Sequence, residues 1–112
     1  MSNNETYNGW ANRETWCFHL WITNDEALYS LTRKLLKDLK KEHEIQQVDI
    51  DFGMVAHAII QTMHKYISLM NTSNDDKYRP YVESWMKLRS DTGDISKVDK
   101  PELSEALMEL IE

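Results

Sequence analysis

Residues 12–22 read NRETWCFHLWI, and this stretch decides the fold. Six of its last seven side chains are apolar, with His19 as the interruption. On an α-helix six such side chains cover most of the circumference, so we expect a short helix that packs on several sides at the centre of the core. Asn12 can cap this helix, because its side-chain oxygen can accept from the free amides of the first turn. Glu14 follows at a position where the helix dipole favours negative charge.

Two longer helical patterns follow this segment. From residue 26 to about 44, after a second start signal at Asn24 and Asp25, leucines recur at steps of three and four on one face. They are Leu28, Leu31, Leu35 and Leu39, and the opposite face carries Arg33, Lys34, Lys37, Lys40 and Lys41. After a connector at 46–49, the helical period returns in Phe52, Val55, Ile59, Met63, Tyr66 and Met70. Alternation with period two is absent there, which favours a third helix over a strand.

The C-terminal part of the chain predicts two more helices. Residues 71–76 form a polar break, and Pro80 suits the first turn of the fourth helix, where its missing amide costs little. The apolar face of that helix consists of Tyr81, Val82, Trp85, Met86 and Leu88. Residues 90–94 (SDTGD) predict a turn. The last helix, at about 101–111, has Leu103, Ala106, Leu107, Leu110 and Ile111 on one side.

The length and the composition agree with this helical pattern. A chain of 112 residues suits one domain with one core. Its 3 glycines and 2 prolines are too few for the corners of a many-stranded barrel or sandwich. We therefore predict an all-α, compact single-domain bundle of about five helices over residues 9–112, preceded by a frayed segment at 1–8. All four tryptophans are expected at or near inward-facing helix positions.

The sequence also predicts the compartment. Cys17 is the one cysteine, so an internal disulfide is excluded. No apolar run reaches the roughly 20 residues that a membrane span requires, and the polar stretch 1–7 lacks the apolar segment of a signal peptide. We expect a soluble, cytoplasmic protein without a membrane partner.

Charge is distributed unevenly along the chain. Residues 91–112 contain seven acidic and two basic side chains and so carry −5 of the net charge of −6. Residues 33–44 are basic, with a charge of +2. One interpretation is that both segments are solvated helix faces that keep the protein soluble. Alternatively, the acidic last helix enters a cationic groove of a partner, or the basic stripe touches phosphates. A pI near 5.2 and the absence of an aromatic residue within the basic face disfavour direct nucleic-acid binding.

Catalytic and metal-binding motifs are weak throughout. His57 and His64 are seven residues apart, which separates their backbones by ~10 Å along a helix and is too far for one ion without a further ligand. Asp49, Asp51 and Gly53 begin like a calcium loop but lack its closing carboxylate. Asp91-Thr92-Gly93 has polar neighbours and predicts a turn, and Cys17 among tryptophans predicts a buried structural thiol. We therefore expect no catalytic residue, no metal and no cofactor.

The N-terminal segment holds the densest group of unusual residues. Tyr7, Asn8, Gly9, Trp10, Asn12, Arg13, Glu14, Thr15, Trp16, His19 and Trp21 lie within fifteen positions. Tryptophan, tyrosine and arginine dominate binding hot spots. The same residues can equally serve the fold, with Gly9 at a positive backbone angle, Asn12 as a cap and the tryptophans in the core. The members that we expect to be partly exposed are Tyr7, Trp10 and Arg13.

The run Tyr7-Asn8-Gly9-Trp10-Ala11-Asn12-Arg13-Glu14-Thr15-Trp16, continued by Leu20-Trp21-Ile22 and Asn24-Asp25, resembles a motif near the start of small proteins carried by prokaryotic viruses, plasmids and their hosts. The motif covers about 20 of the 112 residues. The resemblance implies an accessory protein of a mobile genetic element, located in the host cytoplasm if a virus encodes it. By analogy, small acidic proteins of such elements bind host or defence proteins, including restriction and CRISPR effectors with cationic grooves.

These observations lead to one functional hypothesis with two alternatives. The leading hypothesis is a non-enzymatic protein that binds and modulates a protein partner with a basic surface, such as a host defence or nucleic-acid-processing complex. Its predicted partner-binding residues are Tyr7, Trp10, Arg13, Glu102, Glu105 and Glu109. The first alternative is a small nucleic-acid-binding regulator that uses Arg33, Lys34, Lys37, Lys40 and Lys41. The second is a self-associating structural protein, for which a homodimer is one form.

Overall fold

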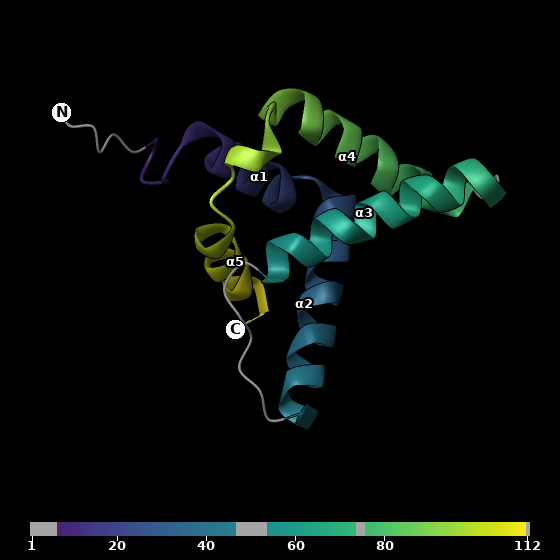
Figure 1. Ribbon diagram of the computed structural model, residues 1–112, viewed down its shortest axis with the longest axis horizontal. Coiled ribbons are helices and arrows are strands. Elements are labelled where there is room, and N and C mark those ends of the chain that lie inside the picture. The colour runs from purple at the N-terminus through teal and green to yellow at the C-terminus, as the bar shows by residue number, and fades with distance from the viewer. Residues whose placement is uncertain (1–6, 47–53, 74–75, 112) are drawn as a thin grey trace.

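Over the residues that the structure describes, the protein folds into five α-helices with three short 3₁₀ helices (Figure 1). The computed structural model describes residues 7–46, 54–73 and 76–111, without the side chains of 43–46 and 111. The helices are α1 (Arg13–Asn24), α2 (Glu26–Gln46), α3 (Met54–Ser73), η1 (Asp76–Tyr78), α4 (Arg79–Thr92), η2 (Ile95–Lys97), α5 (Lys100–Met108) and η3 (Glu109–Ile111). The predicted all-α single-domain bundle is confirmed. Within this bundle α1 touches α2, α4 and α5, while α3 packs against α4 and α5.

The core lies where α1 meets the other helices. Phe18 of α1 and Trp85 of α4 are both fully buried and meet edge to face, with ring centroids 5.7 Å apart. Such a pair adds to the free energy of burial, because the positive edge of one ring faces the negative face of the other. Apolar side chains from all five helices surround this pair: Ile22, Leu28, Leu31, Leu36, Val55, Ala56, Ile59, Ile60, Met63, Leu88, Leu103 and Leu107.

Three expectations about buried side chains need correction. On α2 the buried leucines are Leu28, Leu31 and Leu36, whereas Leu35 and Leu39 only border the core. On α4 Met86 is 58% exposed, because the buried stripe follows Val82, Trp85 and Leu88 and the next position points outward. Of the four tryptophans, Trp85 alone is fully buried, and Trp10, Trp16 and Trp21 are partly exposed.

Helix boundaries follow the predicted signals with local shifts. Asp25 caps α2, because its Oδ1 accepts from the amide of Leu28 at 3.0 Å. Pro80 lies in the first turn of α4, as predicted. The expected turn at 90–94 starts later, since α4 continues to Thr92 and ends at Gly93, whose φ of 85° suits glycine. The connector at 46–49 lies largely, and Phe52 wholly, outside the described residues.

The described part of the chain begins with a tight turn before α1. The backbones of Tyr7 and Trp10 exchange two hydrogen bonds of 2.7 and 2.8 Å. Asn8 and Gly9 between them have φ values of 50° and 87°, which are typical of a two-residue turn and favour asparagine and glycine. Tyr7 and Asn8 are therefore part of a hydrogen-bonded turn, contrary to the expectation of a frayed segment at 1–8, and residues 1–6 lie outside the described part of the chain.

The first turns of α1 and α5 are joined by hydrogen bonds. Asn12 caps α1 by accepting from the amide of Thr15 at 2.9 Å, and its Nδ2 donates to the carbonyl of Lys97 at 2.7 Å. The buried hydroxyl of Thr15 donates to Asn12 Oδ1 at 2.6 Å and accepts from the amide of Asp99 at 2.8 Å. Asp99 caps α5 through the amide of Glu102, and Glu102 Oε1 accepts from the amide of Ala11 at 3.0 Å. Each helix start thus supplies partners for the other.

Asn12 should therefore be more important for stability than an ordinary cap. The variant Asn12→Ala removes the cap of α1, the donor to the Lys97 carbonyl and the acceptor of the Thr15 hydroxyl. We expect a loss of about 2 kcal/mol in the free energy of unfolding, measured by urea denaturation with far-UV circular dichroism. The control is Asn71→Ala, at an exposed site on α3, which should cost under about 0.5 kcal/mol. Equal losses in the two variants would contradict this account.

Candidate protein-interaction surface

The fold brings two of the predicted partner-binding segments together. Trp10 lies beside Glu102, Glu105 and Glu109 of α5 and η3, although more than ninety residues separate them in sequence. Together with Gly9 and Ala106, these four residues line an open groove of about 270 Å³. We call this feature the α5 groove. It combines an aromatic wall with three carboxylates.

Local contacts fix the aromatic wall of the α5 groove. The turn that contains Gly9 places Trp10 against His19 of α1, with ring centroids 4.6 Å apart. The bond from the Ala11 amide to Glu102 ties the next residue to α5. Because both contacts involve helices of the core, the wall is held in place without a partner. Such preorganisation lowers the entropic cost of binding.

The α5 groove is electrically negative. Glu105 and Glu109 are exposed, and within the described part of the chain none of the three glutamates of the groove forms an ion pair. The nearby His19 does not offset this charge at neutral pH, because burial lowers the pKa of its imidazole and favours the neutral ring. The carboxylate of Glu109 raises that pKa in part. The arrangement attracts a cationic group and repels an anionic one.

The other two predicted residues, Tyr7 and Arg13, lie outside the α5 groove. Tyr7 is 39% exposed and packs against Trp16, with ring centroids 4.9 Å apart. Arg13 faces the end of α4, where it donates to the carbonyls of Asp91 at 3.0 Å and Thr92 at 3.4 Å. Its guanidinium is also 3.7 Å from the Asp91 carboxylate. Tyr7, Trp10 and Arg13 are thus all at least partly exposed, as expected. Arg13, however, links α1 to α4 and lies away from the glutamates of the groove.

The alternative site, the basic face of α2, has an aromatic neighbour that the sequence pattern did not predict. Arg33, Lys34 and Lys37 line an open pocket of about 360 Å³ together with Tyr29, Ser30 and Asp38. The guanidinium of Arg33 lies 5.9 Å from the centre of the Tyr29 ring and is partly buried. The expectation that this face lacks an aromatic residue is therefore wrong. Lys40 and Lys41 are exposed further along the helix.

Residues considered for catalysis or metal binding are scattered. His57 and His64 are both exposed on α3, and among the described residues no three histidine, cysteine or acidic side chains are grouped to hold a metal ion. Cys17 is fully buried, as predicted, and burial raises the pKa of its thiol. Asp91-Thr92-Gly93 forms the end of α4 and not a catalytic loop. Asp49, Asp51 and Gly53 lie outside the described residues.

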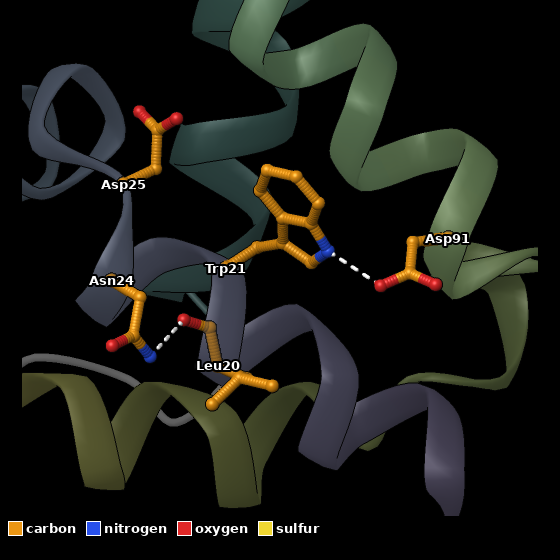
Figure 2. Close-up of a pocket in the computed structure, with 5 residues that line it drawn as sticks. All are labelled: Leu20, Trp21, Asn24, Asp25 and Asp91. Atoms are coloured by element: carbon orange, nitrogen blue, oxygen red, sulfur yellow. Dashed lines mark hydrogen bonds between the residues drawn. The ribbon is translucent and has the colours of Figure 1, made fainter.

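A second pocket, between α1 and the end of α4, was not predicted from the sequence (Figure 2). It has a volume of about 370 Å³, and its walls are Leu20, Trp21, Asn24, Asp25 and Asp91. We call it the Trp21 pocket. Leu20 and Trp21 are adjacent apolar residues on a short helix, and their exposure follows from the packing and has no signal in the local sequence. The contribution of Asp91 comes from 70 positions away and has no local signal.

Comparisons with known proteins give one match. The model of a family described as "Family of unknown function (DUF7249)" matches residues 3–111. No curated protein and no solved structure matches the chain. Separately, none of the helices in the described part of the chain has the length and apolar character needed to cross a membrane.

The partly buried position of His19 against Trp10 predicts that the stability of the protein depends on pH. Because burial lowers the pKa of His19 from its ordinary 6.5, the unfolded chain binds its proton more readily than the folded protein. The stabilisation that depends on neutral His19 is then complete above about pH 6.5 and declines as the pH falls through the folded pKa. We expect the free energy of unfolding to fall more steeply from about pH 7 to about pH 5 in the wild type than in His19→Phe, which keeps a ring against Trp10.

Urea denaturation at a series of pH values measures this difference. The variant His64→Gln changes an exposed histidine of α3 and serves as the control, with a profile like that of the wild type. A His19→Phe profile that runs parallel to the wild-type profile would show that His19 does not contribute.

Proposed function

The chain belongs to the DUF7249 family, and we propose that it is a non-enzymatic binding protein that takes a protein partner with a basic surface into the α5 groove. The main observation in support of this proposal is that Trp10 lines the same groove as Glu102, Glu105 and Glu109. An aromatic side chain supplies a large contact area, and carboxylates at the rim steer a cationic partner and fix its orientation.

The chemistry of the α5 groove supports a protein partner of positive charge. Glu105 and Glu109 are exposed and form no ion pair within the described structure, so a partner's lysine or arginine can approach both without displacing an internal ion pair. The charge of the whole chain, −6, favours the same encounter at long range. The resemblance of the motif that includes Trp10, Asn12 and Thr15 implies an accessory protein of a mobile element, and analogy with small acidic proteins of such elements favours a partner among host nucleic-acid-processing or defence proteins.

Neutralising the groove should abolish most of this binding. In the double variant Glu105→Gln/Glu109→Gln, shape and volume stay nearly the same while two charges disappear. We expect at least about tenfold weaker retention of proteins captured from a host lysate, measured by quantitative mass spectrometry, because each lost charge weakens both steering and contact. Retention by the wild type should also fall steeply from about 50 to about 300 mM salt.

A matched control separates the groove from net charge. Glu26→Gln/Glu83→Gln removes two charges at exposed sites on α2 and α4 and should retain the same proteins as the wild type. If both double variants lose the captured proteins equally, long-range charge acts and the groove does not. If neither loses them, or if salt has no effect, the proposal is wrong.

Nucleic-acid binding through α2 is the second candidate, and the position of Tyr29 beside Arg33 is the observation in its favour. A base can stack on such a ring while Lys34 and Lys37 approach the backbone phosphates. The negative charge of the molecule opposes this, so we expect no retardation of duplex or single-stranded probes in a gel-shift assay at tens of micromolar protein, about 10⁻⁵ M, in low salt. Retardation that is lost in Lys34→Gln/Lys37→Gln would establish the second candidate instead.

Self-association stays a prediction. Tyr7, Leu20 and Met86 are large apolar side chains with substantial exposure on α1, α4 and the preceding turn. Light scattering at two protein concentrations tests whether a defined oligomer forms.

A further inference from the structure

The Trp21 pocket and the α5 groove are lined by different residues. Figure 2 shows the indole of Trp21 in the middle of the pocket, with Asp91 of α4 at its nitrogen and Asp25 toward the other side of the view. Leu20, which is 39% exposed, lies next to Asn24, whose Nδ2 donates to the Leu20 carbonyl at 2.8 Å.

A hydrogen bond holds the aromatic wall of this pocket. The indole Nε1–H of Trp21 donates to Asp91 Oδ2 at 2.8 Å, which fixes the ring relative to α4. The ring itself is only partly buried, so part of its surface borders the open space of the pocket. An exposed aromatic face of this kind binds cations, because the ring quadrupole presents negative potential.

Two carboxylates flank that aromatic wall. Asp25 accepts from the amide of Leu28 at 3.0 Å and from the hydroxyl of Ser84 at 2.8 Å, and within the described structure it has no ion pair. Asp91 is half-exposed, and its nearest cation, the Arg13 guanidinium, is 3.7 Å away. Hydrogen bonds from Trp21 and Cys17 lower the pKa of Asp91 and keep it ionised at neutral pH. Of the two carboxylates that line the pocket, Asp91 is thus paired with Arg13, and within the described structure Asp25 has no ion-pair partner.

We propose that the Trp21 pocket binds the side chain of a single arginine presented by a protein partner. The methylene stem would lie on Leu20 and the planar guanidinium on Trp21, within reach of the carboxylates of Asp25 and Asp91. Arginine fits this set of groups better than lysine, because its planar head stacks on an indole and still donates to carboxylates in its own plane. The pocket volume of about 370 Å³ accommodates a side chain of this size with part of its backbone. This site lies beyond the α5 groove and does not depend on it.

The test uses short peptides and one specific NMR signal. The chain has four tryptophans, so its ¹⁵N spectrum contains four indole signals, and the Trp21→Phe variant identifies the one that belongs to Trp21. The probes are acetyl-Gly-Arg-Gly-amide, the lysine analogue and the citrulline analogue, which keeps the shape of arginine without its charge. We expect the arginine peptide to shift the Trp21 signal saturably, with a Kd on the order of 1–10 mM. The lysine peptide should bind at least threefold more weakly, and the citrulline peptide should give no saturable shift.

Charge-neutral variants test the carboxylates while keeping most of their hydrogen bonds. In Asp25→Asn the side-chain oxygen accepts from the Leu28 amide, and the Nδ2 that replaces Oδ2 donates to the Ser84 hydroxyl instead of accepting from it. The cap of α2 is kept, because asparagine caps as well as aspartate. In Asp91→Asn an oxygen remains to accept from Trp21. Each variant should bind the arginine peptide at least fivefold more weakly, whereas Glu105→Gln, in the α5 groove, should bind it as the wild type does. Far-UV circular dichroism confirms that each variant is folded.

Several results would overturn the proposal. They are no saturable shift of the Trp21 signal up to about 20 mM arginine peptide, an equal response to the citrulline peptide, or unchanged affinity in both asparagine variants. Equal or tighter binding of the lysine peptide would overturn the assignment to arginine. Because the peptides do not require the natural partner, a failure here is distinct from a failure of the α5 groove to retain proteins from a lysate.

Discussion

The first turns of α1 and α5 supply each other's hydrogen-bond partners, and the arrangement of the other helices depends on this contact. A helix start has free amides that must find acceptors, and a buried one cannot find them in water. Here Asn12 and Asp99 each cap their own helix, while Thr15 bridges the two at the level of the core. The contact fixes where α5 crosses α1, and the buried leucines of α5 then meet α3 and α1 in a single geometry.

This constraint also places the surface features. Ala11, one residue before the cap, donates to Glu102, so the turn with Trp10 is drawn onto α5 and its glutamates. On another side of α1, Trp21 is bonded to Asp91 and Arg13 to the same end of α4. The short first helix therefore contacts both surface features: its His19 packs against Trp10 of the α5 groove, and its Leu20 and Trp21 line the Trp21 pocket. The groove has a volume of about 270 Å³ and the pocket one of about 370 Å³ with an aromatic centre.

Local sequence signals predicted much of this fold and little of its surface. Asn12, Asp25 and Pro80 mark helix starts through chemistry that acts within one turn, and these predictions are confirmed. The choice of Leu36 over Leu39 for the core depends on how α2 is rotated against its neighbours, which no spacing rule contains. The pairing of Trp21 with Asp91 joins positions 70 residues apart, and that of Ala11 with Glu102 joins positions 91 apart. Such contacts form only when the helices pack. The sequence therefore showed the negative charge of the last helix, but it did not show that Trp10 lies beside that charge.

The bond between Thr15 and Asp99 closes a loop of 84 residues, which has a consequence for the order of folding. Closing a long loop costs more chain entropy than forming a helical turn, so contacts of this span are expected to form after local ones. During synthesis α1 leaves the ribosome well before α5, so Trp10 is made long before the glutamates that line the groove with it. A chain that stops before α5 would thus contain most of the hydrophobic residues but lack the α5 groove, which forms only after α5 has docked.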